Sequence, residues 1–152
     1  MLFTDVRTAD DARRCVQIVR SETPQAGGTH GAGMRRIVGY VYGNQAEWVK
    51  AMDEVIIALM IEKKGAIENL EEILAVPGID MVQFGPTDYS ISIGMAGQGQ
   101  SDTVQAAHRK MIETARTLNP QVQVAVRSHH EDEARWLADE GGARVFVGEE
   151  EL

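Results

Sequence analysis

Residues 55–88 read VIIALMIEKKGAIENLEEILAVPGIDMVQFGPTD, and this stretch predicts a strand, a helix and a second strand in succession. The first segment, 55–62, is an almost unbroken apolar run, which is typical of a strand covered on both faces in a parallel sheet. Residues 65–78 form a helical pattern with one apolar stripe, and a Pro-Gly pair ends it. Residues 79–85 alternate like a strand again, so we predict a right-handed βαβ unit.

The same alternation of strands and helices continues on both sides of this unit. A short strand at 1–6 precedes a helix with Thr8 as its N-cap, Asp11 as its capping-box partner and Cys15 on its apolar face. The remaining predicted elements are a loop at 23–36, an extended piece at 37–43, helices at 44–54, 101–120 and 129–142, and strands at 122–128 and 144–148. This alternation predicts an α/β fold with about five parallel strands in a single domain that spans 1–152.

Composition restricts the class of protein. The chain has 152 residues and a formal net charge of −8 at pH 7, and its 15 Lys and Arg residues are scattered, so we expect no nucleic-acid partner. No segment approaches the roughly 18 apolar residues of a membrane span, and the start lacks the basic and apolar regions of a signal peptide. The single cysteine fits a reducing compartment. We therefore expect a soluble, cytoplasmic protein without a membrane partner.

Two carboxylates follow the two consecutive strands of the central unit. Glu62 ends the first strand, and Asp88 comes just beyond the second, 26 residues later. Because the carboxyl ends of parallel strands meet at one rim, which is where ligands bind in such folds, we expect both acids there. Two neighbouring acids repel each other unless a hard cation such as Mg²⁺ or Mn²⁺ neutralises them. The alternative is that both are ordinary loop acids or helix caps, which are common, and spacing alone leaves both interpretations open.

Residues 61–94 resemble the signature of the HpcH/HpaI aldolase family, the metal-dependent class II pyruvate aldolases related to citrate lyase β subunits. The matching motifs are Ile61-Glu62, the helix from Ala66 to Leu74, the segment from Gly78 to Phe84 and the run from Gly85 to Ser90. The spacing between the two acids agrees with these motifs. A weaker similarity extends over nearly the whole chain.

The resemblance implies a TIM barrel in which Glu62 and Asp88 bind a divalent metal, Mg²⁺, Mn²⁺ or Co²⁺. It also implies that Gly85, Pro86 and Thr87 form a tight turn whose backbone amides receive the carboxylate of a pyruvate-like 2-oxo acid. The implied activity is that of a carbon–carbon lyase: metal-dependent aldol cleavage or condensation of 4-hydroxy-2-oxo acids, giving pyruvate and an aldehyde.

The chain also departs from the family pattern. By alignment of motifs it corresponds to the fourth to eighth strands of an eight-stranded barrel. The family's proton-transferring histidine and its substrate-polarising arginine belong to the three strands that are absent, so the catalytic acid and base are unknown. An incomplete barrel leaves strand edges unpaired, and we therefore expect a homo-oligomer. The alternatives are a citramalyl- or malyl-CoA lyase-like enzyme, which Asp88-Tyr89 also resembles, and a non-catalytic metal and 2-oxo-acid binding remnant.

For the other reactive side chains we expect structural or surface roles rather than catalytic ones. Lys63 and Lys64 follow Glu62 directly, and a Schiff-base role is conceivable for either. We expect instead that they are surface lysines at a strand–helix junction. The pair His129-His130 begins a predicted helix, where a capping box explains the neighbouring polar residues without a metal. His108 falls in an amphipathic helix, and we expect it to be structural.

Overall fold

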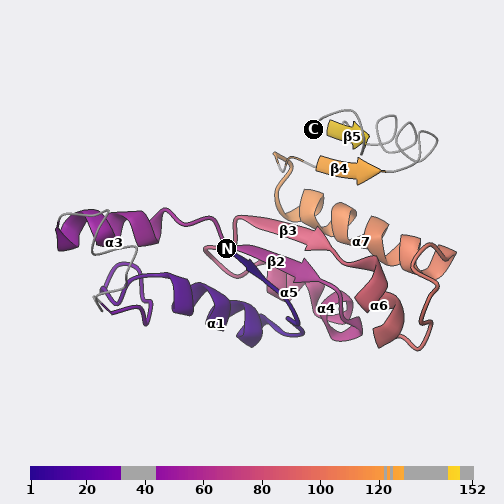
Figure 1. Ribbon diagram of the computed structural model, residues 1–152, viewed down its shortest axis with the longest axis horizontal. Coiled ribbons are helices and arrows are strands. Elements are labelled where there is room, and N and C mark those ends of the chain that lie inside the picture. Colours follow the sequence, from indigo (N-terminus) through magenta and orange to yellow (C-terminus); the bar gives the residue numbers. More distant parts are fainter. Residues whose placement is uncertain (32–43, 122, 124, 129–143, 148–152) are drawn as a thin grey trace. The chain divides into compact units, whose positions relative to one another are not determined.

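The computed structural model describes residues 1–31, 44–121, 123, 125–128 and 144–147 (Figure 1). The chain divides into two compact units, Met1–Thr114 and Ala115–Leu152. Within the described ranges, no helix is both long and apolar enough to cross a membrane.

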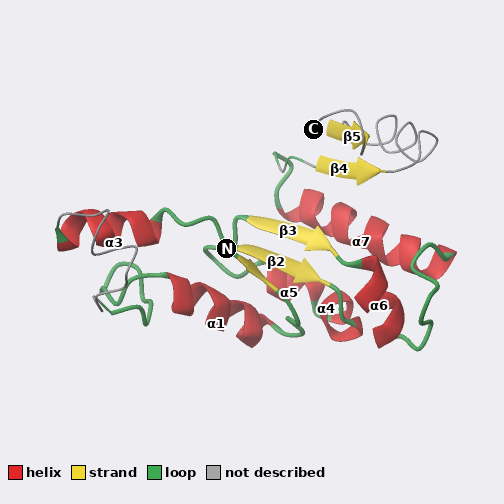
Figure 2. Ribbon diagram, viewed as in Figure 1, coloured by secondary structure: helices red, strands yellow, loops and turns green. Residues whose placement is uncertain are grey.

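A three-stranded parallel sheet organises the first unit. Its strands are β1 (Leu2–Phe3), β2 (Ala58–Ile61) and β3 (Met81–Phe84), in the order β1-β2-β3 (Figure 2). Ile61 is paired in register with Phe84, so β2 and β3 end side by side. The predicted parallel α/β class and the pairing of the two central strands are therefore confirmed.

Strand β2 is shorter than the apolar run that predicted it. The ladder begins only at Ala58 because the N–H of Ile57 donates to the Asp80 carboxylate at 2.8 Å. Leu59 and Ile61 are fully buried on one face of the sheet, whereas Ala58 and Met60 on the other face are half-buried. Within the described residues, β2 is thus packed more closely on one face than on the other.

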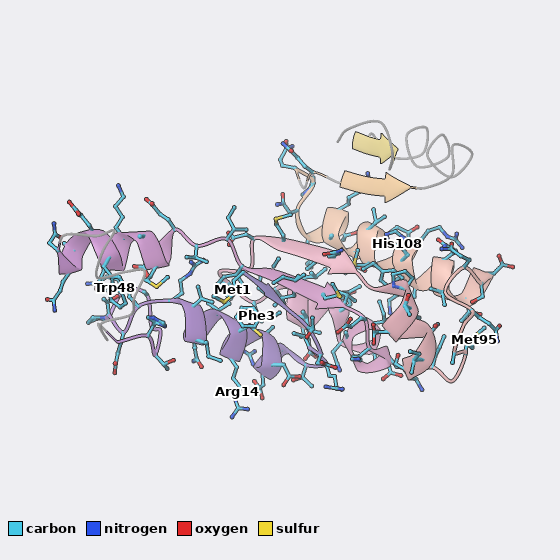
Figure 3. All side chains as sticks on the ribbon, viewed as in Figure 1. Met1, Phe3, Arg14, Trp48, Met95 and His108 are labelled. Carbon is cyan, nitrogen blue, oxygen red and sulfur yellow. The ribbon has the colours of Figure 1, made fainter. Side chains whose placement is uncertain are left out.

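Helices accompany these strands throughout the described residues. They are α1 (Ala9–Val19), α3 (Gln45–Asp53), α4 (Lys64–Glu68), α5 (Leu70–Leu74), α6 (Pro86–Ser92) and α7 (Asp102–Leu118), the last of which runs from the first unit into the second. Helices α1, α5 and α7 contribute to one apolar core with Leu59 and Ile61. On α7 the His108 ring (Figure 3) stacks on Phe84, with 4.8 Å between centroids and 4° between planes, in agreement with a structural role.

The start of α1 has the predicted cap. The N–H of Asp11 donates to the Thr8 hydroxyl at 3.2 Å, and the N–H of Thr8 donates to the Asp11 carboxylate at 2.9 Å, which completes a capping box. A further bond from the Arg7 N–H is the largest cause of a lowered Asp11 pKa. Cys15 is buried, as its position on the apolar face predicts.

The helix predicted at 65–78 is instead two short helices, α4 and α5, which meet at Asn69. The backbone leaves helical geometry there, with φ −106° and ψ 24°. The Asn69 side chain donates to Gly65 O at 2.9 Å and to Arg7 O at 3.1 Å, so it binds the segment after β1. Asparagine side chains compete in this way with the hydrogen bonds of a helical backbone. The apolar periodicity of residues 65–78 did not predict this break. The predicted apolar stripe still faces the core, because Leu70 and Ile73 are both buried.

In the second unit, β4 (Ala125–Ser128) and β5 (Arg144–Val147) pair in parallel. All five predicted strands are therefore present, as one sheet of three strands and one of two. The predicted helix at 129–142, with His129-His130, lies outside the described residues. The extended piece at 37–43 lies outside them as well.

Candidate metal and oxo-acid site

Carboxylates follow each of the three strands of the first sheet. Asp5 comes two residues after β1, Glu62 comes directly after β2, and Asp88 lies four residues after β3. Because the strands are parallel, these ends share one edge of the sheet, the edge at which parallel α/β folds bind ligands. Glu62 and Asp88 were predicted from the sequence, but Asp5 was missed. The strand predicted at 1–6 included Asp5, whereas β1 ends at Phe3, so the rule about strand ends did not reach this residue from the sequence.

Glu62 is the buried member of the group, with a relative exposure of only 4%. Its Oε1 accepts a hydrogen bond from the backbone N–H of Asp5 at 2.9 Å. Gly85 lies against its other side. A Cβ added to Gly85 would be 2.8 Å from the Glu62 Cβ and 3.2 Å from Oε2, so only glycine fits there without a shift. The two strand ends therefore hold Glu62 from both sides.

Asp88 belongs to the first turn of α6, and its side chain is 55% exposed. The carboxylate lies 3.9 Å from the ammonium of Lys63, which is the residue after Glu62. Glu62 thus contacts Gly85, just after β3, and Asp88 contacts Lys63, just after β2. Each of the two predicted acids therefore contacts a residue that follows the other acid's strand.

The predicted turn at Gly85, Pro86 and Thr87 is the junction at which β3 becomes α6. Gly85 is the N-cap of the helix and Pro86 its first residue, where a missing N–H costs nothing. The Gly85 N–H already donates to Ile61 O at 3.1 Å, and proline has no N–H. Of the three predicted residues, therefore, only Thr87 keeps an amide that the helix itself cannot use. The resemblance implied that the amides of this turn together receive a carboxylate, whereas only one of the three residues has an amide left for that role.

Hydrogen bonds of two serine hydroxyls stabilise the junction between β3 and α6. Ser90 donates to Thr87 O at 2.7 Å, which explains its burial without a catalytic role. Ser92 accepts from the Lys64 N–H at 3.0 Å, so the end of α6 is tied to the start of α4. The loop after α6, which contains Met95 (Figure 3), returns to the same junction. A Cβ added to Gly99 in this loop would be 3.6 Å from Pro86 O.

Lys63 is the less exposed of two cations that pair with Asp5, the other being Arg7 at 3.6 Å. Its Nζ lies 2.9 Å from the Asp5 carboxylate, and its side chain is only 18% exposed. The bond with Asp5 raises the pKa of Lys63, and the same bond lowers the pKa of Asp5. A charged lysine between acids is a poor nucleophile, which agrees with the interpretation against a Schiff base.

The comparison with protein families decides the identity of the chain. The model of the HpcH/HpaI aldolase/citrate lyase family matches residues 1–147. The chain belongs to this family. The resemblance of residues 61–94 is thereby confirmed.

Two curated relatives illustrate the family's activities. The hydroxypyruvate/pyruvate aldolase of Paraburkholderia phytofirmans is 31% identical over 120 residues, which are 76% of this chain and 45% of that protein. The 4-hydroxy-2-oxo-heptane-1,7-dioate aldolase of Shigella flexneri is 35% identical over 119 residues, which are 74% of this chain and 41% of that protein. The chain spans less than half the length of either.

Solved structures of the family share the fold. The HpcH/HpaI aldolase of Desulfitobacterium hafniense superposes with a TM-score of 0.74 at 27% identity, and the match covers 97% of this chain and 56% of that one. A family protein of Burkholderia cenocepacia gives a TM-score of 0.78 at 24% identity, over 96% and 56% of the two chains, and supports the fold alone.

The residues at this edge fit a hard divalent cation. Glu62 and Asp88 supply carboxylate oxygens, the ligands that Mg²⁺ and Mn²⁺ prefer, and glycine at position 85 leaves the space beside the Glu62 Oε2 unfilled. Among the side chains that the structure describes, no three His, Cys, Asp or Glu residues form a metal-binding group. Two carboxylates would therefore leave the other coordination positions to water and substrate.

Proposed function

We propose that the chain carries the metal and 2-oxo-acid binding part of a carbon–carbon lyase. The reaction is the aldol cleavage or condensation of 4-hydroxy-2-oxo acids, with pyruvate and an aldehyde as products. The observation that carries this proposal is the pair Glu62 and Asp88 at neighbouring strand ends in a chain of the HpcH/HpaI family. The names of the aldolase relatives support the same reaction class.

Each residue of the edge has a role in the proposal. Glu62 and Asp88 hold Mg²⁺, Mn²⁺ or Co²⁺, which when bound acts as a Lewis acid toward the enolate of the 2-oxo acid. Thr87 offers its N–H to the substrate carboxylate at the positive end of α6. Gly85 and Pro86 set the approach of that backbone. The acid and base that move the proton of the 4-hydroxyl are not assigned to any residue.

The architecture belongs to the proposal as well. We place the five strands as the fourth to eighth strands of a (β/α) barrel, in one domain over 1–152, in a cytoplasmic protein. The parallel pairing and the family match support the barrel. The citramalyl- or malyl-CoA lyase-like reaction and the non-catalytic binding remnant remain the alternatives.

Isotope exchange separates these functions. In D₂O with Mn²⁺, the chain is expected to exchange the methyl protons of pyruvate slowly, because a bound metal would stabilise the enolate while solvent or buffer takes the proton and returns a deuteron. Cleavage of a 4-hydroxy-2-oxo acid also needs general acid–base catalysis, which typically contributes about 10²–10⁴-fold, and no residue is assigned to it here, so cleavage is expected to be very slow. Proton NMR follows the exchange, and a coupled assay for pyruvate follows the cleavage.

Chelation with EDTA provides the control for both assays. Exchange that survives chelation would contradict the metal role, and binding of pyruvate without any exchange would favour the non-catalytic remnant. Cleavage at the rate of full-length relatives would show that a residue assigned here to structure is the base. Turnover of a CoA thioester but not of a free 2-oxo acid would favour the lyase-like alternative.

Self-association is the expected state in solution. In the described part of the chain, β1 and β3 each pair only with β2, and Leu2 and Met81 are largely exposed. Unpaired strand edges with exposed apolar side chains favour pairing with another copy. Sedimentation velocity is expected to give a dimer or larger assembly, and a monodisperse monomer over the micromolar range would contradict this expectation.

A further inference from the structure

Lys63 occupies a position that the proposed function does not explain. Its ammonium lies between two carboxylates from different strand ends, 2.9 Å from Asp5 and 3.9 Å from Asp88. The first distance is that of a charge-assisted hydrogen bond, and the second is only an ion-pair contact. Asp5 is therefore the main partner of Lys63, although Asp88 is within reach.

Asp5 is held in an unusual backbone conformation. Its φ of 61° makes it the one non-glycine residue with positive φ in the described part of the chain. Such a conformation costs free energy and persists only where the surroundings enforce it. Here the Asp5 N–H donates to Glu62 Oε1 at 2.9 Å, and the Asp5 carbonyl accepts from the Arg7 guanidinium at 2.8 Å. The strained residue thus orients the most buried acid of the site.

We propose that Asp5 is a positioning residue of the metal site, acting on Glu62 through its backbone N–H and on Asp88 through Lys63. The inference rests on the proposed function of Glu62 and Asp88. By holding the ammonium at 2.9 Å, Asp5 keeps Lys63 from closing the 3.9 Å gap to Asp88. Asp88 then stays available to a divalent cation. Lys63 in turn competes with the cation for Asp88, because like charges at this range repel.

Mn²⁺ binding to four proteins tests this coupling. The proteins are the unaltered chain, Asp5→Asn, Lys63→Met and the double variant, each titrated with Mn²⁺ alone by isothermal calorimetry. Asparagine tolerates positive φ, and its N–H can still bond Glu62, so Asp5→Asn keeps the backbone contact and removes the carboxylate charge. That charge holds Lys63 at 2.9 Å and also pairs with the exposed guanidinium of Arg7 at 3.6 Å. It is expected to weaken Mn²⁺ binding about tenfold, as is typical for residues that orient metal ligands.

The other two variants show whether the effect passes through Lys63. Lys63→Met removes the competing ammonium and is expected to tighten Mn²⁺ binding about threefold, as for a partly exposed charge pair. In that background, Asp5→Asn is expected to weaken binding by less than about threefold. An equal loss in both backgrounds would show that Asp5 acts as a direct charge or ligand, and would overturn the proposal. Unchanged or weaker binding by Lys63→Met would overturn it too, even if Asp5→Asn failed to fold.

One further variant separates this inference from the proposed function. If Glu62→Gln binds Mn²⁺ as tightly as the unaltered chain, the metal site itself is wrongly assigned. If Glu62→Gln loses the metal while Asp5→Asn binds normally, the site stands and only the role of Asp5 fails.

Discussion

Glu62→Gln and Asp88→Asn are each expected to weaken Mn²⁺ binding by more than about 100-fold, which exceeds the 10–100-fold effect typical of residues that only orient ligands. Each change replaces a carboxylate by an amide of the same shape and removes half of the charge that two acids offer to the cation. The fold is expected to remain, because the amide oxygen of glutamine can still accept the bond from the Asp5 N–H. Calorimetric titration with Mn²⁺ measures the affinity, and circular dichroism checks the fold.

Glu54→Gln is the matched control for these two variants. Glu54 is an exposed acid of the same unit, and its carboxylate lies 3.7 Å from the ammonium of Lys50. It precedes β2, at the opposite end of that strand from Glu62, and its substitution changes the net charge by the same amount, so Mn²⁺ affinity is expected to stay within about twofold. If the two site variants bound Mn²⁺ as the control does, the assignment of Glu62 and Asp88 would be wrong.

Gly85→Ala has the second large expected effect, on stability and metal binding together. The added methyl group would lie 2.8 Å from the Glu62 Cβ, closer than carbon atoms approach without a shift. Overpacking of this kind costs about 1–3 kcal/mol of unfolding free energy. Because relief requires Glu62 or the end of β3 to move, Mn²⁺ affinity is expected to fall as well. Thermal unfolding and Mn²⁺ titration of the same samples measure the two effects.

Gly99→Ala provides the comparison for the glycine variant. Its methyl group would meet Pro86 O at 3.6 Å, an ordinary van der Waals distance, at the same junction of the fold. It is expected to leave stability and Mn²⁺ binding nearly unchanged. If Gly85→Ala unfolded at the same temperature as Gly99→Ala and bound Mn²⁺ equally well, the close approach of Gly85 to Glu62 would not matter in solution.

Local sequence patterns were sufficient to predict the strands, the start of α1 and part of the candidate site. The apolar run at 55–62 and the alternation at 79–85 predicted two neighbouring parallel strands, because burial on a sheet leaves a direct imprint on residue order. Thr8 and Asp11 predicted a helix start, since a cap depends only on residues three apart. Glu62 and Asp88 were predicted at one edge because parallel strands end together, but the metal role of both remains a prediction.

The remaining features of the fold and of the site depend on contacts between distant segments, which no local sequence periodicity encodes. The bond from Asp5 to Glu62 joins residues 57 positions apart, and the bond from Asn69 to Arg7 joins residues 62 apart. Asn69 therefore breaks a helix that its own neighbourhood favours, and Asp5 adopts a left-handed backbone that its own neighbourhood does not require. Gly85 has the pattern of a turn residue in the chain, yet a Cβ at this position would meet the side chain of Glu62. These features arise only when β1, β2 and β3 lie side by side, because packing at their shared edge outweighs local preference.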